Sequence, residues 1–237
     1  MDKILIAHRS GPVDFPEQTV ESAKQAMQLG ADMVEIDLRF SKDKKIIICH
    51  DDNTLRVFGI DKKTSELTAR EFCSLTHKDN PLYHGHLLSD YISSSIKPLL
   101  LHIKEGGENL PFIMSFLDES NYLENVTIGS SNIDDIKYIK ANFPYVQALA
   151  FIKSPSFIEE SIEAGADIIR LWEGNATREN ILRIKSRGKK CCIMVGNVSG
   201  FPVGETSEEF LKYILNENID ALLINDITIA RALMKNR

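Results

Sequence analysis

The sequence predicts an α/β protein, a (β/α)8 TIM barrel with a small insertion after the second barrel strand. Short apolar runs alternate with amphipathic segments along the chain, which is typical of a parallel sheet covered by helices. A junction from an amphipathic segment through a turn into an apolar run recurs in "AMQLGADMVEI", "SIEAGADIIRL" and "LNENIDALLI". The length of 237 residues also suits a single barrel of roughly 250.

Nine short apolar segments of the sequence are expected to form strands. In chain order they span residues 3–7, 33–38, 45–49, 99–103, 126–130, 146–152, 167–172, 191–195 and 221–225. Only about six residues separate the second from the third, which is too short for a parallel crossover and predicts an antiparallel hairpin. The other strands match the number that a closed barrel requires.

Helix starts are expected where a capping side chain precedes an apolar segment of helical period. Thr19, Ser131 and Thr177 each stand in this position. Thr206 with Glu209 forms the T-x-x-E pattern of a capping box before the last but one expected helix.

The domain prediction is a single TIM-barrel domain over residues 1–237 with an insertion at about 51–98. The inserted segment departs from the alternation and holds a short helix with a T-x-x-E box at Thr68, followed by the polar stretch "HKDNPLYHGH". Elsewhere, Gly30 and Gly165 stand where a helix ends in a left-handed residue before the next strand.

Composition narrows the class of protein. Apolar residues make up 43% and charged residues 26% of the chain, and the net charge is −6, without the basic surface that nucleic-acid binding needs. No apolar run approaches the ~18 residues of a membrane span. The four cysteines show no CxxC spacing. We therefore expect a cytoplasmic protein without a nucleic-acid partner or stable membrane association. The sequence does not determine the oligomeric state.

Ionisable residues gather at the carboxyl ends of the first four predicted strands, where barrel enzymes carry their catalytic groups. These residues are His8, Arg9, Glu35, Asp37, His50, Asp51, His102 and Lys104. None of the four strands begins with a comparable cluster. This polarity indicates an enzyme.

Glu35 and Asp37 lie two residues apart on a predicted strand, so both side chains leave the same face. Two close carboxylates either raise one pKa or need a cation between them. A divalent metal such as Mg²⁺ or Ca²⁺ fits this requirement, and pairing with Lys104 or Arg9 is the alternative. His102 is either a third metal ligand or a satisfied core histidine.

His8 and His50 are the natural pair for proton transfer, because imidazole titrates near neutral pH. Arg9 would offer a fork of donors to an anionic oxygen, and Lys104 can neutralise a phosphate or a carboxylate. Asp51 either orients His50 or bonds to the backbone, and the sequence does not separate these roles.

Two features lie nearer the carboxyl terminus. Trp172, the only tryptophan, ends a predicted strand and shares a face with Arg170, which favours a pocket wall at the barrel mouth. The segment 203–206, "VGET", places a glycine ahead of a helix N-terminus, where it could meet an anion. Helix capping explains that glycine equally well.

These residues in this order resemble the glycerophosphodiester phosphodiesterase family. That family carries His-Arg-Gly, Pro-Glu-Asn-Thr, Glu-x-Asp, His-Asp and Glu-x-Lys in succession. The matching segments are "HRS" at 8–10, "PEQT" at 16–19, "EID" at 35–37, "HD" at 50–51 and "HIK" at 102–104. The resemblance runs over essentially the whole chain and is strongest in its first quarter.

The resemblance implies a (β/α)8 barrel and metal-assisted hydrolysis of a small glycerophosphodiester to glycerol 3-phosphate and an alcohol. It assigns acid–base roles to His8 and His50. Glu35 and Asp37 would bind a divalent cation, and Arg9 and Lys104 would bind phosphoryl oxygens. Glu17 would support the site near the metal.

Four positions depart from the family pattern. Ser10 replaces a glycine, Gln18 replaces an asparagine, and Met194 stands where many members have tryptophan. His102 replaces the glutamate that completes the metal site, which leaves the cation open among Mg²⁺, Ca²⁺ and Mn²⁺, because nitrogen suits Mn²⁺ better than Ca²⁺. Two alternatives follow: an impaired member that binds a phosphorylated ligand, or a phospholipase-like phosphodiesterase acting on lysolipids.

Overall fold

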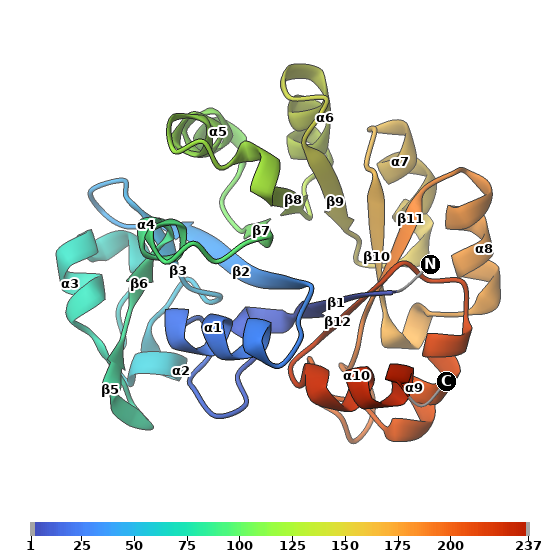
Figure 1. Ribbon diagram of the computed structural model, residues 1–237. Helices are drawn as coiled ribbons and strands as arrows, with labels where there is room; N and C mark the ends of the chain where they lie inside the picture. Colours follow the sequence, from blue (N-terminus) through green and yellow to red (C-terminus); the bar gives the residue numbers. More distant parts are fainter. Residues whose placement is uncertain (1–2, 236–237) are drawn as a thin grey trace.

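Eight parallel strands close into a barrel in the computed structural model, which describes residues 3–235 (Figure 1). Their order is β1 (Ile4–Ala7), β2 (Met33–Phe40), β7 (Leu99–Ile103), β8 (Val126–Ser130), β9 (Gln147–Phe151), β10 (Ile168–Trp172), β11 (Lys190–Met194) and β12 (Ala221–Ile224). The barrel closes because β1 pairs in parallel with both β12 and β2. The predicted fold and the predicted strands are therefore confirmed.

Helices surround the barrel on the outside (Figure 1). They are α1 (Val20–Gln28), α5 (Leu110–Glu119), α6 (Ile133–Asn142), α7 (Ile158–Glu163), α8 (Arg178–Ser186), α9 (Glu208–Asn216) and α10 (Ile227–Lys235). Short 3₁₀ turns lie in the connections between strands and helices: η1 (His8–Ser10), η3 (Gly107–Asn109), η4 (Leu123–Asn125), η5 (Pro155–Phe157) and η6 (Glu173–Asn175). One apolar layer lies between strands and helices, and a smaller one inside the barrel includes Leu100, Leu149 and Leu223.

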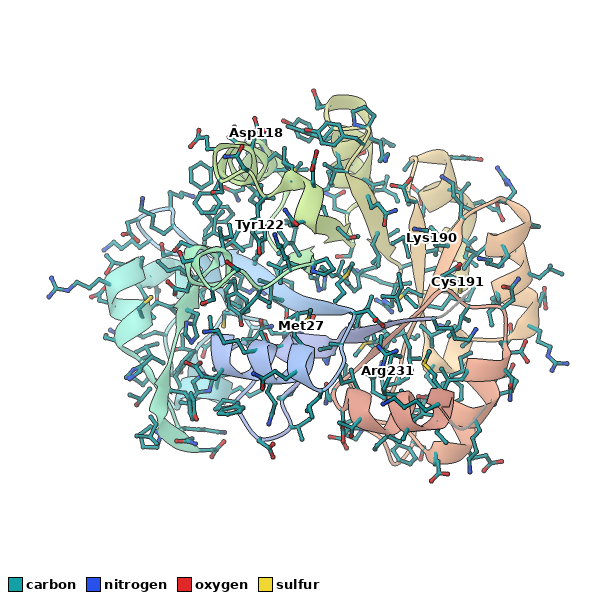
Figure 2. All side chains as sticks on the ribbon, viewed as in Figure 1. Met27, Asp118, Tyr122, Lys190, Cys191 and Arg231 are labelled. Atoms are coloured by element: carbon teal, nitrogen blue, oxygen red, sulfur yellow. The ribbon has the colours of Figure 1, made fainter. Side chains whose placement is uncertain are left out.

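The last helix is tied to the first helix–strand turn, which helps to hold the barrel closed. Arg231 lies on α10 (Figure 2). It donates to the carbonyl oxygen of Gly30 and pairs with Asp32 at 2.7 Å. Asp32 also accepts a hydrogen bond from the backbone N–H of Leu5 at 2.8 Å. Gly30 has φ +101°, and Gly165 has φ +96°, as expected for residues that end helices.

The segment after β2 leaves the barrel as a hairpin, as predicted. Strand β3 (Ile46–Ile48) runs antiparallel to β2, and β6 (His86–Leu87) pairs with β3. Between β3 and β7 lie α2 (Leu55–Phe58), η2 (Thr64–Glu66), α3 (Ala69–Ser74), β4 (Thr76–His77), β5 (Asn80–His84) and α4 (Leu88–Ser93). They occupy the expected insertion. Helices α2 and α3 pack on a separate apolar cluster, whereas α4 joins the main core through Leu88 and Tyr91.

Capping residues place most helix starts correctly. Thr19, Thr68 and Thr177 accept hydrogen bonds from backbone N–H groups of the first turn of their helices. Two predicted starts are wrong by one residue. Ser207, not Thr206, caps α9, and Asn132, not Ser131, caps α6.

The two errors have one physical cause: neighbouring polar residues both match a capping pattern, and the local backbone decides between them. Ser207 Oγ accepts from the N–H of Phe210 at 3.1 Å. Thr206 Oγ1 is buried and has no hydrogen-bond partner within residues 3–235.

No helix in this described range is long and apolar enough to cross a membrane.

Candidate active site

A cavity of about 280 Å³ opens at the carboxyl ends of the barrel strands. The structure brings eight of the ten predicted site residues to its wall: His8, Arg9, Glu35, Asp37, His50, His102, Lys104 and Trp172. The other two, Glu17 and Asp51, lie immediately behind the wall in contact with Arg9 and His50. The rule that catalytic groups follow barrel strands therefore found a real cluster.

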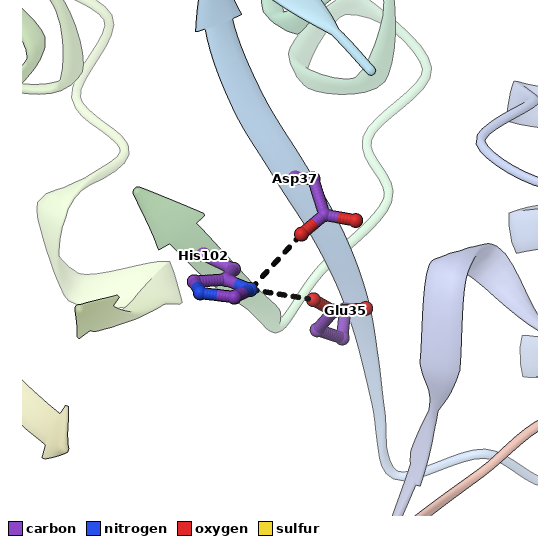
Figure 3. Close-up of side chains that lie close together, drawn as sticks. All are labelled: Glu35, Asp37 and His102. Carbon is purple, nitrogen blue, oxygen red and sulfur yellow. Dashed lines mark ion pairs between the residues drawn. The ribbon is translucent and has the colours of Figure 1, made fainter. Parts of the chain in front are cut away.

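The acid pair lies on one face of β2, and both side chains are 1% exposed. One oxygen of each carboxylate is held by a fixed donor. Glu35 Oε2 accepts from the backbone N–H of Arg9 at 2.8 Å, and Asp37 Oδ2 accepts from Gln18 Nε2 at 2.6 Å. The remaining oxygens, Glu35 Oε1 and Asp37 Oδ1, point toward His102 (Figure 3).

His102 completes a group of three possible metal ligands. Strand register places it beside Asp37, and its Nδ1 lies 2.9 Å from Asp37 Oδ1 and 3.7 Å from Glu35 Oε1 (Figure 3). One ligand atom from each of the three residues lies within 4.8 Å of the other two. This spacing fits a single divalent cation bound by two carboxylate oxygens and one imidazole nitrogen.

Asp37 Oδ1 supplies a test of that fit. It is buried, and although His102 and Lys104 approach it to 2.9 and 3.3 Å, no donor within residues 3–235 makes a well-directed hydrogen bond to it. Burial raises the pKa of Asp37, but His102, Lys104 and His50 outweigh this and hold its pKa well below the ordinary value. A buried, ionised oxygen without a directed donor is suited to metal ligation.

The ring of His102 is held in a fixed plane. It stacks on Phe151 with ring centroids 3.9 Å apart and planes 19° from parallel. Phe151 fits there because its neighbour on β8 is Gly129, where a Cβ atom would lie 2.3 Å from the phenyl ring. Neither residue was identified from the sequence, since an aromatic and a glycine on buried strands look like ordinary core.

His8 has a defined hydrogen-bond partner in the loop that follows the last barrel strand, β12. Its Nδ1 lies 2.7 Å from Asn225 Oδ1, while Asn225 Nδ2 donates to the carbonyl oxygen of Val203 at 3.4 Å. Because the amide presents its oxygen to His8, Nδ1 carries the proton and Nε2 keeps its lone pair. Burial lowers the pKa of His8, and the charge of Glu35 only partly opposes this.

The glycine of "VGET" belongs to the same arrangement. Gly204 has φ +90°, and a Cβ atom there would lie 2.0 Å from Asn225 Oδ1. Its role is therefore to leave room for the partner of His8, and no anion is needed to explain it.

His50 is paired with Asp51, whose carboxylate lies 2.7 Å from Nδ1. Of the two roles open for Asp51, the structure shows the contact with His50. Burial lowers the pKa of His50 below its ordinary 6.5, and Arg9 and Lys104 add to this, whereas the charge of Asp37 and the hydrogen bond to Asp51 raise it.

Arg56, which the sequence analysis missed, joins the two supporting acids. Its Nε contacts Asp51 at 2.5 Å, and its terminal nitrogens form a fork on Glu17 at 2.6 and 2.9 Å. Glu17 in turn lies 3.2 Å from Arg9. Burial would raise the pKa of Glu17, but Arg56 and Arg9 lower it overall. This chain of contacts fixes His50 and Arg9 relative to each other.

Two departures from the family pattern are accommodated by the backbone. Ser10 adopts φ 72°, a conformation that favours glycine, and its hydroxyl is 2.9 Å from Tyr91 Oη. Gln18, also left-handed at φ 61°, reaches Asp37 with its longer side chain. Left-handed non-glycine residues cluster at functional sites, and these two flank the acid pair.

Trp172 lines the cavity from β10, the strand opposite β2 in the barrel order. The guanidinium of Arg170 lies between aromatic rings, with Cζ 4.2 Å from the Trp172 ring centroid and 5.2 Å from that of Phe151. The predicted pocket wall at Trp172 is thus a stack of three side chains that spans two strands.

Comparison with known proteins supports the resemblance read from the motifs. Residues 8–105 match the model of the "Glycerophosphoryl diester phosphodiesterase family". A glycerophosphodiester phosphodiesterase of Caldanaerobacter subterraneus subsp. tengcongensis is 26% identical over 62% of this chain and 65% of that protein. Human lysophospholipase D GDPD1 is 33% identical over 50% of this chain and 37% of that protein. The alignments thus span less than two thirds of these relatives' own length.

Solved structures confirm the fold. A glycerophosphodiester phosphodiesterase from Agrobacterium tumefaciens superimposes with a TM-score of 0.81 at 16% identity, over 98% of this chain and 100% of that one. A phosphodiesterase from Oleispira antarctica, in complex with the product sn-glycerol-3-phosphate, gives 0.83 at 18% identity over 98% and 96%.

Proposed function

We propose that this chain, which is related to the glycerophosphoryl diester phosphodiesterase family, hydrolyses glycerophosphodiesters to glycerol 3-phosphate and an alcohol with the help of a divalent metal cation. The observation that carries the proposal is the cavity itself, where an acid pair with an unbonded carboxylate oxygen lies beside two imidazoles and two cationic side chains. These groups match the needs of phosphodiester cleavage: charge stabilisation at phosphorus and proton transfer on two sides.

Glu35, Asp37 and His102 would hold the cation. When bound, Mg²⁺, Ca²⁺ or Mn²⁺ would stabilise negative charge on the phosphoryl oxygens. With one imidazole among the ligands, the set favours Mn²⁺ over Ca²⁺ more than a set of three carboxylates does. Asp37 is ready for this role because its pKa is already far below neutral.

The two histidines would move the protons, and their partners support distinct roles. His8 keeps a lone pair on Nε2, because Nδ1 donates to Asn225, and would accept the proton of the attacking water as its oxygen bonds to phosphorus. His50 donates through Nδ1 to the Asp51 carboxylate, which favours the imidazolium form and opposes the lowering of its pKa by burial. It would protonate the leaving alcohol as the other phosphorus–oxygen bond breaks.

Arg9 and Lys104 would bind the non-bridging phosphoryl oxygens from either side of the acid pair. Glu17 and Asp51 would act as supporting residues, joined by Arg56. Trp172 would contact the organic part of the substrate. The four cysteines are unpaired, which supports the proposed cytoplasmic location. A glycerophosphodiester substrate would give the reaction a role in lipid and glycerol metabolism.

The acid–base assignment predicts a directional pH effect for Asp51→Asn. The hydrogen bond to Asp51 raises the pKa of His50, so its loss lowers that pKa further. If His50 is the acid, it must be protonated, and the alkaline limb of the kcat/KM profile moves to lower pH. The acid limb, set by His8, stays in place. A shift of the acid limb instead would make His50 the base.

The activity is tested by removing metal with a chelator and adding back Mg²⁺, Ca²⁺ or Mn²⁺ while glycerol 3-phosphate release is measured. Glycerophosphocholine and glycerophosphoglycerol serve as substrates. We expect product only with a divalent cation. An absence of product with every cation and both substrates contradicts the proposal, and tight binding without turnover would identify an impaired member of the family.

Lysolipid hydrolysis is the second candidate. It is supported by the human relative and by a hollow of about 240 Å³ with apolar lining from Ile133, Ile152 and Phe157. Phe151 borders both this hollow and the catalytic cavity, so an alkyl chain could leave the site there. Turnover of micellar lysophospholipid above that of soluble diesters would favour this substrate class.

A further inference from the structure

Arg170 is a buried cation that the proposed hydrolysis does not use. It lies on β10, four strands from β2 in either direction around the barrel, and lines the catalytic cavity. The acid pair and its neighbouring cations therefore occupy one wall of the cavity and Arg170 the opposite wall. A ligand whose phosphate is bound by Arg9 and Lys104, beside the acid pair, would extend toward Arg170.

The guanidinium of Arg170 forms no ion pair with any carboxylate of the described residues 3–235. The residue is 5% exposed, yet Nε and Nη1 are buried without a hydrogen-bond acceptor. Burial lowers the pKa of Arg170 to about 10, which still leaves it charged at neutral pH. An unpaired buried charge destabilises a fold and is usually retained for binding.

The aromatic neighbours leave the guanidinium ready for an oxyanion. Phe151 and Trp172 contact it by cation–π interactions, which occupy the faces of the planar group. The N–H groups project from its edge in a fork that matches the oxygens of a phosphate or carboxylate. Stacking also limits its motion, so little freedom would be lost on binding.

The charge of the cavity also favours a ligand with a second anionic group. The cavity wall carries three cationic side chains, Arg9, Lys104 and Arg170, against two carboxylates, and a divalent cation would add further positive charge. A simple phosphodiester brings one negative charge. The site is therefore electrostatically complementary to a ligand with more than one anionic group.

We propose that Arg170 binds a second oxyanion of the substrate, across the cavity from the phosphate that is cleaved. The preferred substrates are then glycerophosphodiesters that also carry a phosphomonoester or a carboxylate. This inference rests on the proposed hydrolase function and narrows its substrate class. The cavity volume of about 280 Å³ is near the lower end of ligand pockets and suits two small alcohols.

Three substrates with the same carbon skeleton test it: glycerophosphoglycerol, its terminal phosphate ester, and glycerophosphoglycerate with a carboxylate. We expect the wild type to favour one or both anionic substrates by about 10- to 100-fold in kcat/KM, mainly through KM. The phosphate and carboxylate arms show which oxyanion is preferred. In Arg170→Met, which keeps the length of the side chain, the ratio should fall to within about threefold of one.

Each contrary result has a definite meaning. Equal loss on all three substrates in Arg170→Met would place Arg170 at the cleaved phosphate and overturn the inference. So would a wild type without preference, or a preference that survives the substitution. Hydrolysis of neutral glycerophosphoglycerol by the wild type tests the proposed function separately, because it does not depend on a second anion.

A binding measurement does not require turnover. We expect glycerol 1,3-bisphosphate to bind the wild type about tenfold more tightly than glycerol 3-phosphate, and Arg170→Met to bind both alike. Equal affinities in the wild type would contradict the inference even if no diester were cleaved. Arg170→Lys, which keeps the charge, should retain part of the difference in affinity. It replaces Arg170→Met in the test if that variant does not fold. Since Arg170→Met removes an unpaired charge, we expect its unfolding temperature to equal or exceed that of the wild type.

Discussion

His8→Ala is expected to lower kcat for glycerophosphodiester hydrolysis by about 10²- to 10⁴-fold, the usual contribution of a positioned acid or base. The side chain is 7% exposed, and Asn225 holds its Nδ1 at 2.7 Å. Alanine removes the lone pair that would accept the proton and adds no substitute. The measurement is the steady-state rate of glycerol 3-phosphate release at saturating metal and substrate.

The control for this variant is His84→Ala, since His84 is exposed on β5 and lies outside the cavity. It should keep wild-type activity. Asn225→Ala should fall between the two, because it leaves the imidazole but frees its orientation. Substrate affinity and the circular dichroism spectrum of His8→Ala should stay close to those of the wild type. Retention of more than a tenth of kcat would exclude His8 from proton transfer.

The reason the sequence predicts this barrel is that local pattern and tertiary structure agree along most of the chain. A strand of apolar residues, a polar turn and a capped helix each have short-range signatures, and the repeated unit sets the fold. The acid pair was found the same way, because alternation on β2 alone places Glu35 and Asp37 on one face. One-residue errors at Thr206 and Ser131 arose where an adjacent polar residue matched the same cap.

The residues that were missed depend on contacts that no short-range pattern contains. Arg56 meets Glu17 across 39 residues, and His8 meets Asn225 across 217. Arg170 could be placed on the inner face of its strand from the sequence, but whether a carboxylate neutralises it depends on which strands surround it. The unpaired state that motivates the substrate inference is therefore visible only in three dimensions.

His102→Glu should change the metal preference of the site. Glutamate replaces a nitrogen ligand with an oxygen ligand and adds a negative charge beside Glu35 and Asp37. Ca²⁺ and Mg²⁺, which bind through oxygen, should gain about 10- to 100-fold in affinity relative to Mn²⁺ or Zn²⁺. Calorimetric titration of the metal-free protein with each cation measures this, and the activity at limiting metal should follow the same order.

His102→Gln is the matched control, because it supplies an oxygen without adding charge. It should move the preference toward Ca²⁺ less than glutamate does. Glutamate also loses the stack on Phe151 and the contact of His102 Nδ1 with Asp37, and it crowds three carboxylates together. The metal-free His102→Glu protein should therefore unfold at a lower temperature than the wild type and be stabilised more by Ca²⁺. An unchanged order of cation affinities in both variants would show that His102 does not bind the metal. In that case His102 would be the charge partner of the acid pair through its contact with Asp37.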